Sequence, residues 1–131
     1  MKKYHNQNKS FSLSHILHSF QNAFRGLKLL LKYEYNLYIE LLLAMFAIFL
    51  GFFLSISQNE WVSLIIVIGL VIFSELSNTV VEKIMDFIHD DYHTKVRDIK
   101  DLAAGAVLVS SFISIIVACF IFLPKIFIFL S

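Results

Sequence analysis

Three apolar stretches, at 41–57, 61–73 and 102–123, constrain the fold of this chain more than any other feature, and none of them carries a charged side chain. A helix must supply roughly 20 apolar residues to cross a hydrocarbon core about 30 Å thick. At 131 residues and 58% hydrophobic content, the chain is too short for two soluble domains and too apolar for one. The stretches therefore predict an all-α membrane protein with three transmembrane helices.

The boundaries of these helices follow from residues that favour turns or interfaces. The polar segment 58–60 predicts a tight turn after the first span, and Trp61 suits an aromatic anchor at the interface. The second helix is predicted over 61–86 and the third over 102–123, where Pro124 should end it because proline lacks a backbone donor. The whole chain, 1–131, is predicted to be one domain.

The region before the first span has a different pattern. Residues 1–10 are polar and predict a flexible tail. Over 12–33, apolar side chains recur at spacings of three and four, whereas basic side chains take the other sides of the helix. This pattern predicts an amphipathic helix on the membrane surface.

Basic residues predict the orientation of the spans. They concentrate before the first span and in the connection between the second and third spans: Lys2, Lys3, Lys9, Arg25, Lys28, Lys32, Lys83, Lys95, Arg97 and Lys100. The turn at 58–60 has none, and the C-terminal end has only Lys125. Because cytoplasmic loops carry the excess of Lys and Arg, the N-terminus and the 82–101 connection are predicted to be cytoplasmic.

A polar stripe interrupts the second helix where it should still run through the membrane. Asn78, Glu82 and Asp86 follow Glu75 at offsets of 3, 7 and 11, so all four share one helix face. A charge inside a span costs about 2.5–3.5 kcal/mol, so Glu75 should face a partner, a cavity or a metal. Taken singly, the members have plainer interpretations: a neutral structural Glu75, a helix-linking Asn78, or a solvated helix end at Glu82 and Asp86.

Further polar residues are predicted at the same cytoplasmic interface. Glu34 ends the surface helix, and Lys100 and Asp101 precede the third span. Carboxylates converging with a lysine suit Mg²⁺ that carries nucleotide phosphates. The four glycines are too far apart for a phosphate-binding loop. His89 and His93 have a spacing that could bind zinc on a helix, but their surroundings resemble a loop.

The run Glu75-Leu-Ser-Asn78-Thr-Val-Val-Glu82-Lys-Ile-Met-Asp86 resembles the signature E-x-x-N-[ST]-A-[IV]-E-x-x-x-D of the prokaryotic diacylglycerol kinase and undecaprenol kinase family. Further matches stand in register, and together they cover residues 11 to about 123: Asn22-Ala-Phe-x-Gly26, Glu34-x-Asn36, Tyr92-His93, and Lys100-Asp101 followed by AAGAVL. The resemblance implies a homotrimer in the bacterial inner membrane that transfers the γ-phosphate of ATP to the hydroxyl of a membrane lipid.

The resemblance also implies roles for individual residues. Glu75 matches the general base, and Glu34 and Glu82 match the carboxylates that hold Mg²⁺ on the nucleotide. The ATP site would further include these matching positions: Asn22, Asp91, Tyr92, His93, Lys100 and Asp101. Asn78 and Asp86 match supporting polar residues. His15 departs from the pattern, because enteric diacylglycerol kinases carry an arginine there near the phosphates and the lipid.

The acceptor is predicted from two segments. The AAGAVLVS run and the Asn-Ala-Phe-x-Gly segment resemble undecaprenol kinases more closely, so undecaprenol is favoured, and diacylglycerol is the alternative. A different class of function is a non-catalytic membrane oligomer, such as a cation-conducting assembly lined by Glu75. The net charge of +1 gives no reason to expect nucleic acid as a partner.

Overall fold

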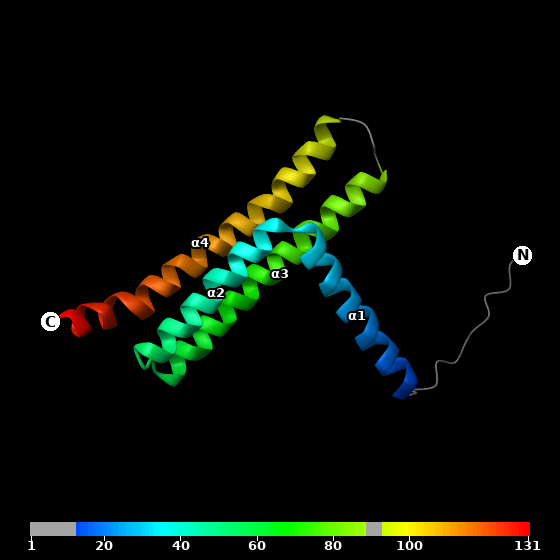
Figure 1. Cartoon of the computed structure of the whole chain (residues 1–131). Helices are drawn as coiled ribbons and strands as arrows, with labels where there is room; N and C mark the ends of the chain where they lie inside the picture. The colour runs from blue at the N-terminus through cyan, green and yellow to red at the C-terminus, as the bar shows by residue number, and fades with distance from the viewer. Residues whose placement is uncertain (1–12, 89–92) are drawn as a thin grey trace, which may run out of the picture. The chain divides into compact units, whose positions relative to one another are not determined.

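The computed structural model describes residues 13–88 and 93–131, and these residues form α-helices and no strands. The helices are α1 (Leu13–Tyr33), α2 (Tyr35–Phe53), α3 (Gln58–Ile88) and α4 (Thr94–Leu130) (Figure 1). The chain divides into two compact units, one ending at Tyr33 and the other running from Glu34 to Ser131. The predicted all-α class is confirmed. The predicted tail at 1–10 lies outside the described residues.

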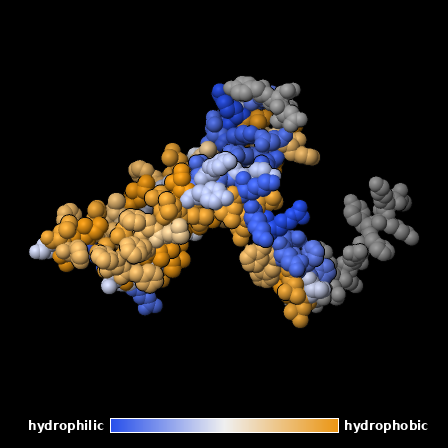
Figure 2. All heavy atoms as spheres, in the orientation of Figure 1, coloured by the Kyte–Doolittle hydropathy of each residue, from blue (hydrophilic) through white to orange (hydrophobic). Residues whose placement is uncertain are grey.

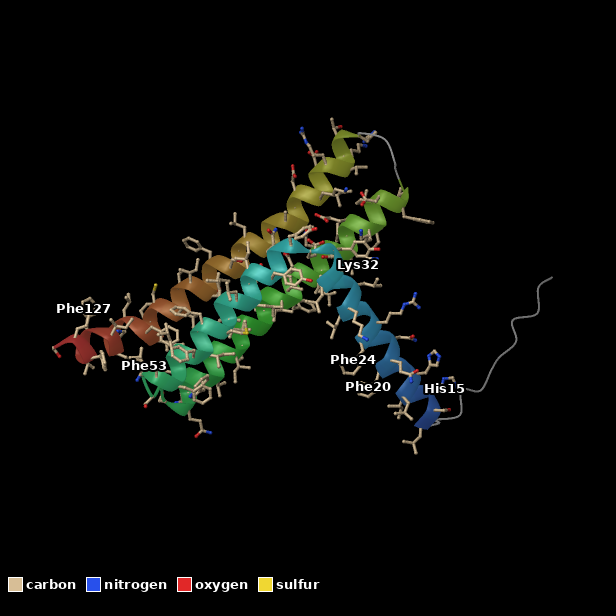
Figure 3. The ribbon with its side chains drawn as sticks, in the orientation of Figure 1. His15, Phe20, Phe24, Lys32, Phe53 and Phe127 are labelled. Carbon is tan, nitrogen blue, oxygen red and sulfur yellow. The ribbon has the colours of Figure 1, made fainter. Side chains whose placement is uncertain are left out.

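The first unit contains α1, which is amphipathic as predicted. Phe20 and Phe24 point to one side of the helix and His15 to the other (Figure 3). Hydrophobic and hydrophilic residues accordingly occupy opposite sides of α1 in the space-filling view (Figure 2). A helix with such a face suits the boundary between lipid and water.

The second unit is built around α3. All three of its helices are long and apolar enough to cross a membrane, which confirms the three predicted spans by length and composition. In the most apolar stretch of each helix, 39% of residues are buried in α3, against 11% in α2 and 17% in α4, so α3 is the central helix. Hydrophilic residues of this unit gather where α3 ends and α4 begins, and orange hydrophobic residues cover most of the rest (Figure 2).

Two kinds of contact join α3 to its neighbours. At the end near the α2–α3 turn, an apolar cluster contains Ile56, Leu64, Ile121 and Phe122. Farther along, the hydroxyls of Ser74 and Ser110 lie 2.6 Å apart, and both side chains are buried. Hydroxyl pairs of this kind join helices in a membrane, where apolar side chains gain little by leaving lipid.

The predicted turn at 58–60 is wrong, because the turn lies at 54–57 and Gln58 already begins α3. Ser57 and Glu60 form a capping box: the Ser57 N–H donates to Glu60 Oε2 at 2.6 Å, and the Glu60 N–H donates to Ser57 Oγ at 3.4 Å. Ser55, with φ of 51°, provides the left-handed residue of the turn. The capping bonds start the helix one turn earlier than polarity alone suggests.

The predicted end of the third helix at Pro124 is also wrong, since α4 continues through this proline to Leu130. Tertiary contacts support the continuation. Lys125 Nζ lies 3.2 Å from Glu60 Oε2, and Ile126 packs against the apolar cluster at the same end. These contacts offset the loss of the one helix hydrogen bond that proline cannot donate.

Close packing at the α2–α3 turn leads to a stability prediction. A Cβ placed on Gly51 would lie 2.8 Å from Trp61 Cη2 and 3.1 Å from Ile56 Cδ1. We expect Gly51→Ala to destabilise the protein by about 1–3 kcal/mol, because the indole must move. Thermal unfolding in detergent would measure this. Gly69→Ala is the matched control, since nothing lies within 4 Å of its Cβ, and equal melting temperatures of the two variants would contradict the prediction.

Candidate active site

The polar stripe predicted on α3 is buried at Glu75 and Asn78, partly buried at Glu82 and exposed at Asp86. Glu75 is 2% exposed and Asn78 is 8% exposed, and the Asn78 side-chain amide donates to Glu82 Oε1 at 3.3 Å. The carbonyl oxygen of the Asn78 side chain is buried and has no hydrogen-bond partner among residues 13–88 and 93–131. A buried acceptor without a partner is costly, so this oxygen is suited to receive a donor from a bound molecule.

Glu34 joins this face from the start of α2. It occupies the N-cap position in an extended conformation, yet its side chain makes no capping hydrogen bond to its own helix. Its Oε1 instead accepts a hydrogen bond from Thr79 Oγ1 at 2.9 Å. The contact joins residues 45 positions apart in the sequence, and it brings a second carboxylate to α3 within the same compact unit.

The carboxylates form one electrostatic group. Glu34 and Glu82 are the charged neighbours that act on Glu75, and Glu75 in turn acts on Glu40. No set of three or more His, Cys, Asp and Glu side chains in the described part of the chain is arranged as a closed metal site. Two oxygen ligands are nevertheless enough for Mg²⁺ that keeps waters and substrate phosphates in its shell.

A lysine lies beside this acidic group. The Lys100 ammonium donates to Asp86 Oδ1 across the ends of α3 and α4, and Lys100 also interacts electrostatically with Glu82. The predicted meeting of Lys100 with the stripe is therefore found in the structure. Lys100 remains two-thirds buried while Asp86 is exposed, so the ammonium sits between the helices with its charge near the carboxylates.

Asp101 lies elsewhere. It is exposed and lines a groove between α3 and α4 together with Ser77 and Asp98. Ser77 is two residues from Glu75, about 200° around the helix, so this groove lies on another face of α3. Within one chain, the structure does not bring Asp101 to the stripe.

The remaining predicted residues fall into three places. His15 and Asn22 are exposed on α1 in the first unit, where the Asn22 amide lies 3.2 Å from His18 Nδ1. His93 caps α4, and its Nδ1 accepts a hydrogen bond from the Lys95 N–H at 3.2 Å. The other predicted residues, together with the first histidine of the zinc alternative, lie outside the described residues: His89, Asp91 and Tyr92.

The sequence interpretation missed Glu40. This carboxyl group is half-buried on α2, and its Oε2 has no hydrogen-bond partner in the described ranges. It lines a cavity of about 330 Å³ whose walls are mostly apolar residues of α2, α3 and α4. The signal in the sequence was an acid immediately before the apolar stretch 41–57.

Three apolar helices that gather carboxylates and a lysine at their polar end have the features of a membrane-embedded phosphotransferase. The sequence model of the family "Prokaryotic diacylglycerol kinase" matches residues 21–122. The chain is also 36% identical over 113 residues to the undecaprenol kinase of Bacillus subtilis (strain 168), covering 86% of this chain and 92% of that protein. This chain belongs to the prokaryotic diacylglycerol kinase family and is a lipid kinase of the membrane. The non-catalytic alternative is set aside.

Proposed function

We propose that this lipid kinase phosphorylates the terminal hydroxyl of undecaprenol, with ATP as the phosphoryl donor. The carboxylate group formed by the buried Glu75 and the partly buried Glu34 and Glu82, at the polar end of the central helix, is the observation that carries the proposal of a phosphoryl-transfer site. Undecaprenol is favoured over diacylglycerol because the relative from Bacillus subtilis is named an undecaprenol kinase and matches this chain over most of its length.

Glu75 is the general base in this proposal. A lipid alcohol is a weak nucleophile, and a carboxylate next to its hydroxyl accepts the proton as the oxygen attacks. A bond forms between this oxygen and the γ-phosphorus of ATP. The bond from the γ-phosphorus to the β–γ bridging oxygen breaks, and ADP leaves with the electron pair. The site must meet water-soluble ATP and a membrane alcohol together, and a buried acid at the polar end of a span satisfies both demands.

Glu34 and Glu82 are the proposed Mg²⁺ ligands. Their oxygen donors fit a hard cation, and both lie near Glu75. When bound, Mg²⁺ orients the phosphates and neutralises their developing charge. Asn78 keeps one hydrogen bond to Glu82 and has a free carbonyl oxygen toward the site, and Asp86 positions Lys100.

Further residues are proposed to contact ATP or the lipid headgroup by their match to the family pattern. On the ATP side these are Asn22, Asp91, Tyr92, His93, Lys100 and Asp101, and on the lipid side His15. Because Asp101, on α4, lines a groove on another face of α3 from Glu75, its contact with ATP would require a site shared between subunits. A homotrimer supplies such a neighbour.

We also propose where the protein lies. The helices cross the inner membrane of a bacterium, with the N-terminus and the acidic site on the cytoplasmic side, where ATP is available. The basic residues before the first span and around the α3–α4 connection support this orientation.

A competition assay tests the acceptor. Purified full-length protein in mixed micelles receives radiolabelled Mg·ATP and equal amounts of undecaprenol and diacylglycerol, and the lipid products are separated by chromatography. We expect labelled undecaprenyl phosphate to exceed labelled phosphatidic acid. The reverse ratio would assign the chain to diacylglycerol, and the absence of any labelled lipid would overturn the proposed function.

A further inference from the structure

A hydroxyl from α3 holds the Glu34 carboxylate. Thr79 Oγ1 donates to Glu34 Oε1 at 2.9 Å, and Thr79 is 7% exposed. The contact is partly buried, because Glu34 remains partly exposed. A hydrogen bond to a charged acceptor in such a place is stronger than one between neutral groups, so it restrains the carboxylate effectively.

Helix formation alone does not explain this contact. Threonines in helices commonly donate to the carbonyl four residues earlier, and Thr79 Oγ1 also lies 3.0 Å from the Glu75 carbonyl oxygen. A hydroxyl has one proton to donate, however. A carboxylate oxygen is a stronger acceptor than a peptide carbonyl oxygen, which favours the bond to Glu34. The Thr79 hydroxyl therefore lies between Glu34, the proposed metal ligand, and the turn of α3 that carries Glu75, the proposed base.

Glu34 needs an external restraint because of its place in the chain. It lies between α1 and α2 in an extended conformation, and no capping hydrogen bond fixes its side chain to α2. A long, unrestrained carboxylate must lose side-chain entropy when it binds a cation. A donor that already fixes one oxygen reduces this loss and leaves the second oxygen for the cation.

We propose that Thr79 is a positioning residue that pre-orients Glu34 for the divalent cation of the nucleotide complex. The inference rests on the proposed function, because it deepens the assignment of Glu34 as a metal ligand. Thr79 acts through Glu34 and does not itself touch the substrate. Residues that orient metal ligands in this way typically change metal affinity about 10- to 100-fold when they are removed.

Binding of Mn²⁺ with a non-hydrolysable ATP analogue, followed by electron paramagnetic resonance, tests this role without catalysis. The full-length protein in detergent is titrated as wild type, Thr79→Val and Thr79→Ser. We expect Thr79→Val to weaken Mn²⁺ binding about tenfold or more, and Thr79→Ser, which keeps the hydroxyl, to bind close to wild type. Ser63→Ala is the matched control, because its hydroxyl donates to the Asn59 carbonyl of the same helix, near the opposite end from Thr79.

The outcomes separate the two proposals. If wild type binds Mn²⁺ with the nucleotide and Thr79→Val binds it equally well, the positioning role is wrong and the proposed function stands. If wild type binds no Mn²⁺, the metal assignment itself is overturned. A double-mutant cycle with Glu34→Gln adds a check, since Thr79→Val should have little further effect once the carboxylate is gone. Thr79→Ala replaces Thr79→Val in these measurements if the valine variant aggregates.

Discussion

Glu75→Gln is expected to lower the rate of lipid phosphorylation about 10³-fold, while the protein still inserts and folds. The substitution keeps the size of the side chain and its burial at 2% exposure, but an amide cannot accept the hydroxyl proton. General acid–base catalysis by one positioned group contributes typically about 10²- to 10⁴-fold. Initial rates with labelled ATP at saturating lipid would measure the loss, and size-exclusion chromatography would verify that the variant elutes as wild type does.

Glu60→Gln is the matched control for this experiment. It makes the same chemical change on the same helix, but at the opposite end, where Glu60 pairs with Lys125 and Ser57. We expect this variant to lose stability and to keep its turnover rate once folded. A Glu75→Gln protein as active as wild type would show that another group takes the proton, and Glu40, the nearby carboxyl on α2, would be the next residue to test.

Removal of divalent metal has the second large expected effect. Excess chelator should reduce phosphoryl transfer to background, and Mg²⁺ should restore it. Glu34→Gln and Glu82→Gln should each lower activity about 10²- to 10³-fold at a fixed Mg²⁺ concentration, because each removes a negatively charged ligand of the cation that neutralises the phosphates. Activity measured against Mg²⁺ concentration separates weakened metal binding from a slower chemical step.

The control for the carboxylate variants is again Glu60→Gln. Glu60 lies at the opposite end of α3 beside Lys125, so the variant removes a carboxylate without touching the acidic group. Its Mg²⁺ dependence should match wild type. Transfer that survives the chelator unchanged would contradict the assignment of Glu34 and Glu82 as metal ligands.

The sequence predicts the helices well where apolar length or periodicity determines them. The three spans, the amphipathic helix over 13–33 and the shared face of Glu75 and Asn78 all follow from spacing. The errors occur at helix ends, where local hydrogen bonds or tertiary contacts determine the boundary. Ser57 and Glu60 carried the pattern of a capping box and could have located the start of α3, whereas the contacts that extend α4 beyond Pro124 become visible only in three dimensions.

The candidate site is less predictable than the fold. The site residues on α3 can be found from their helical spacing in the sequence. The hydrogen bond from Thr79 to Glu34, however, joins residues 45 positions apart and depends on how α2 packs against α3. Spacing in the sequence gives no measure of that packing. The placement of Asp101 in a separate groove has a different cause, one that helical spacing could have predicted: neighbouring residues on a helix point about 100° apart, so Lys100 and Asp101 face different surroundings.

The buried pair of Ser74 and Ser110 sets the sliding register of α4 against α3. From this pair to the Asp86–Lys100 ion pair, α3 advances by about 18 Å and α4 by about 15 Å at 1.5 Å per residue. The separation between the two contacts is therefore nearly the same along α3 as along α4, which run antiparallel. If α4 slipped by one turn, the two hydroxyls would lose contact with each other and keep only the carbonyl oxygens of their own helices, and Lys100 would leave the carboxylates. A contact between two buried hydroxyls therefore fixes where a lysine meets the carboxylates at the polar end of the helices.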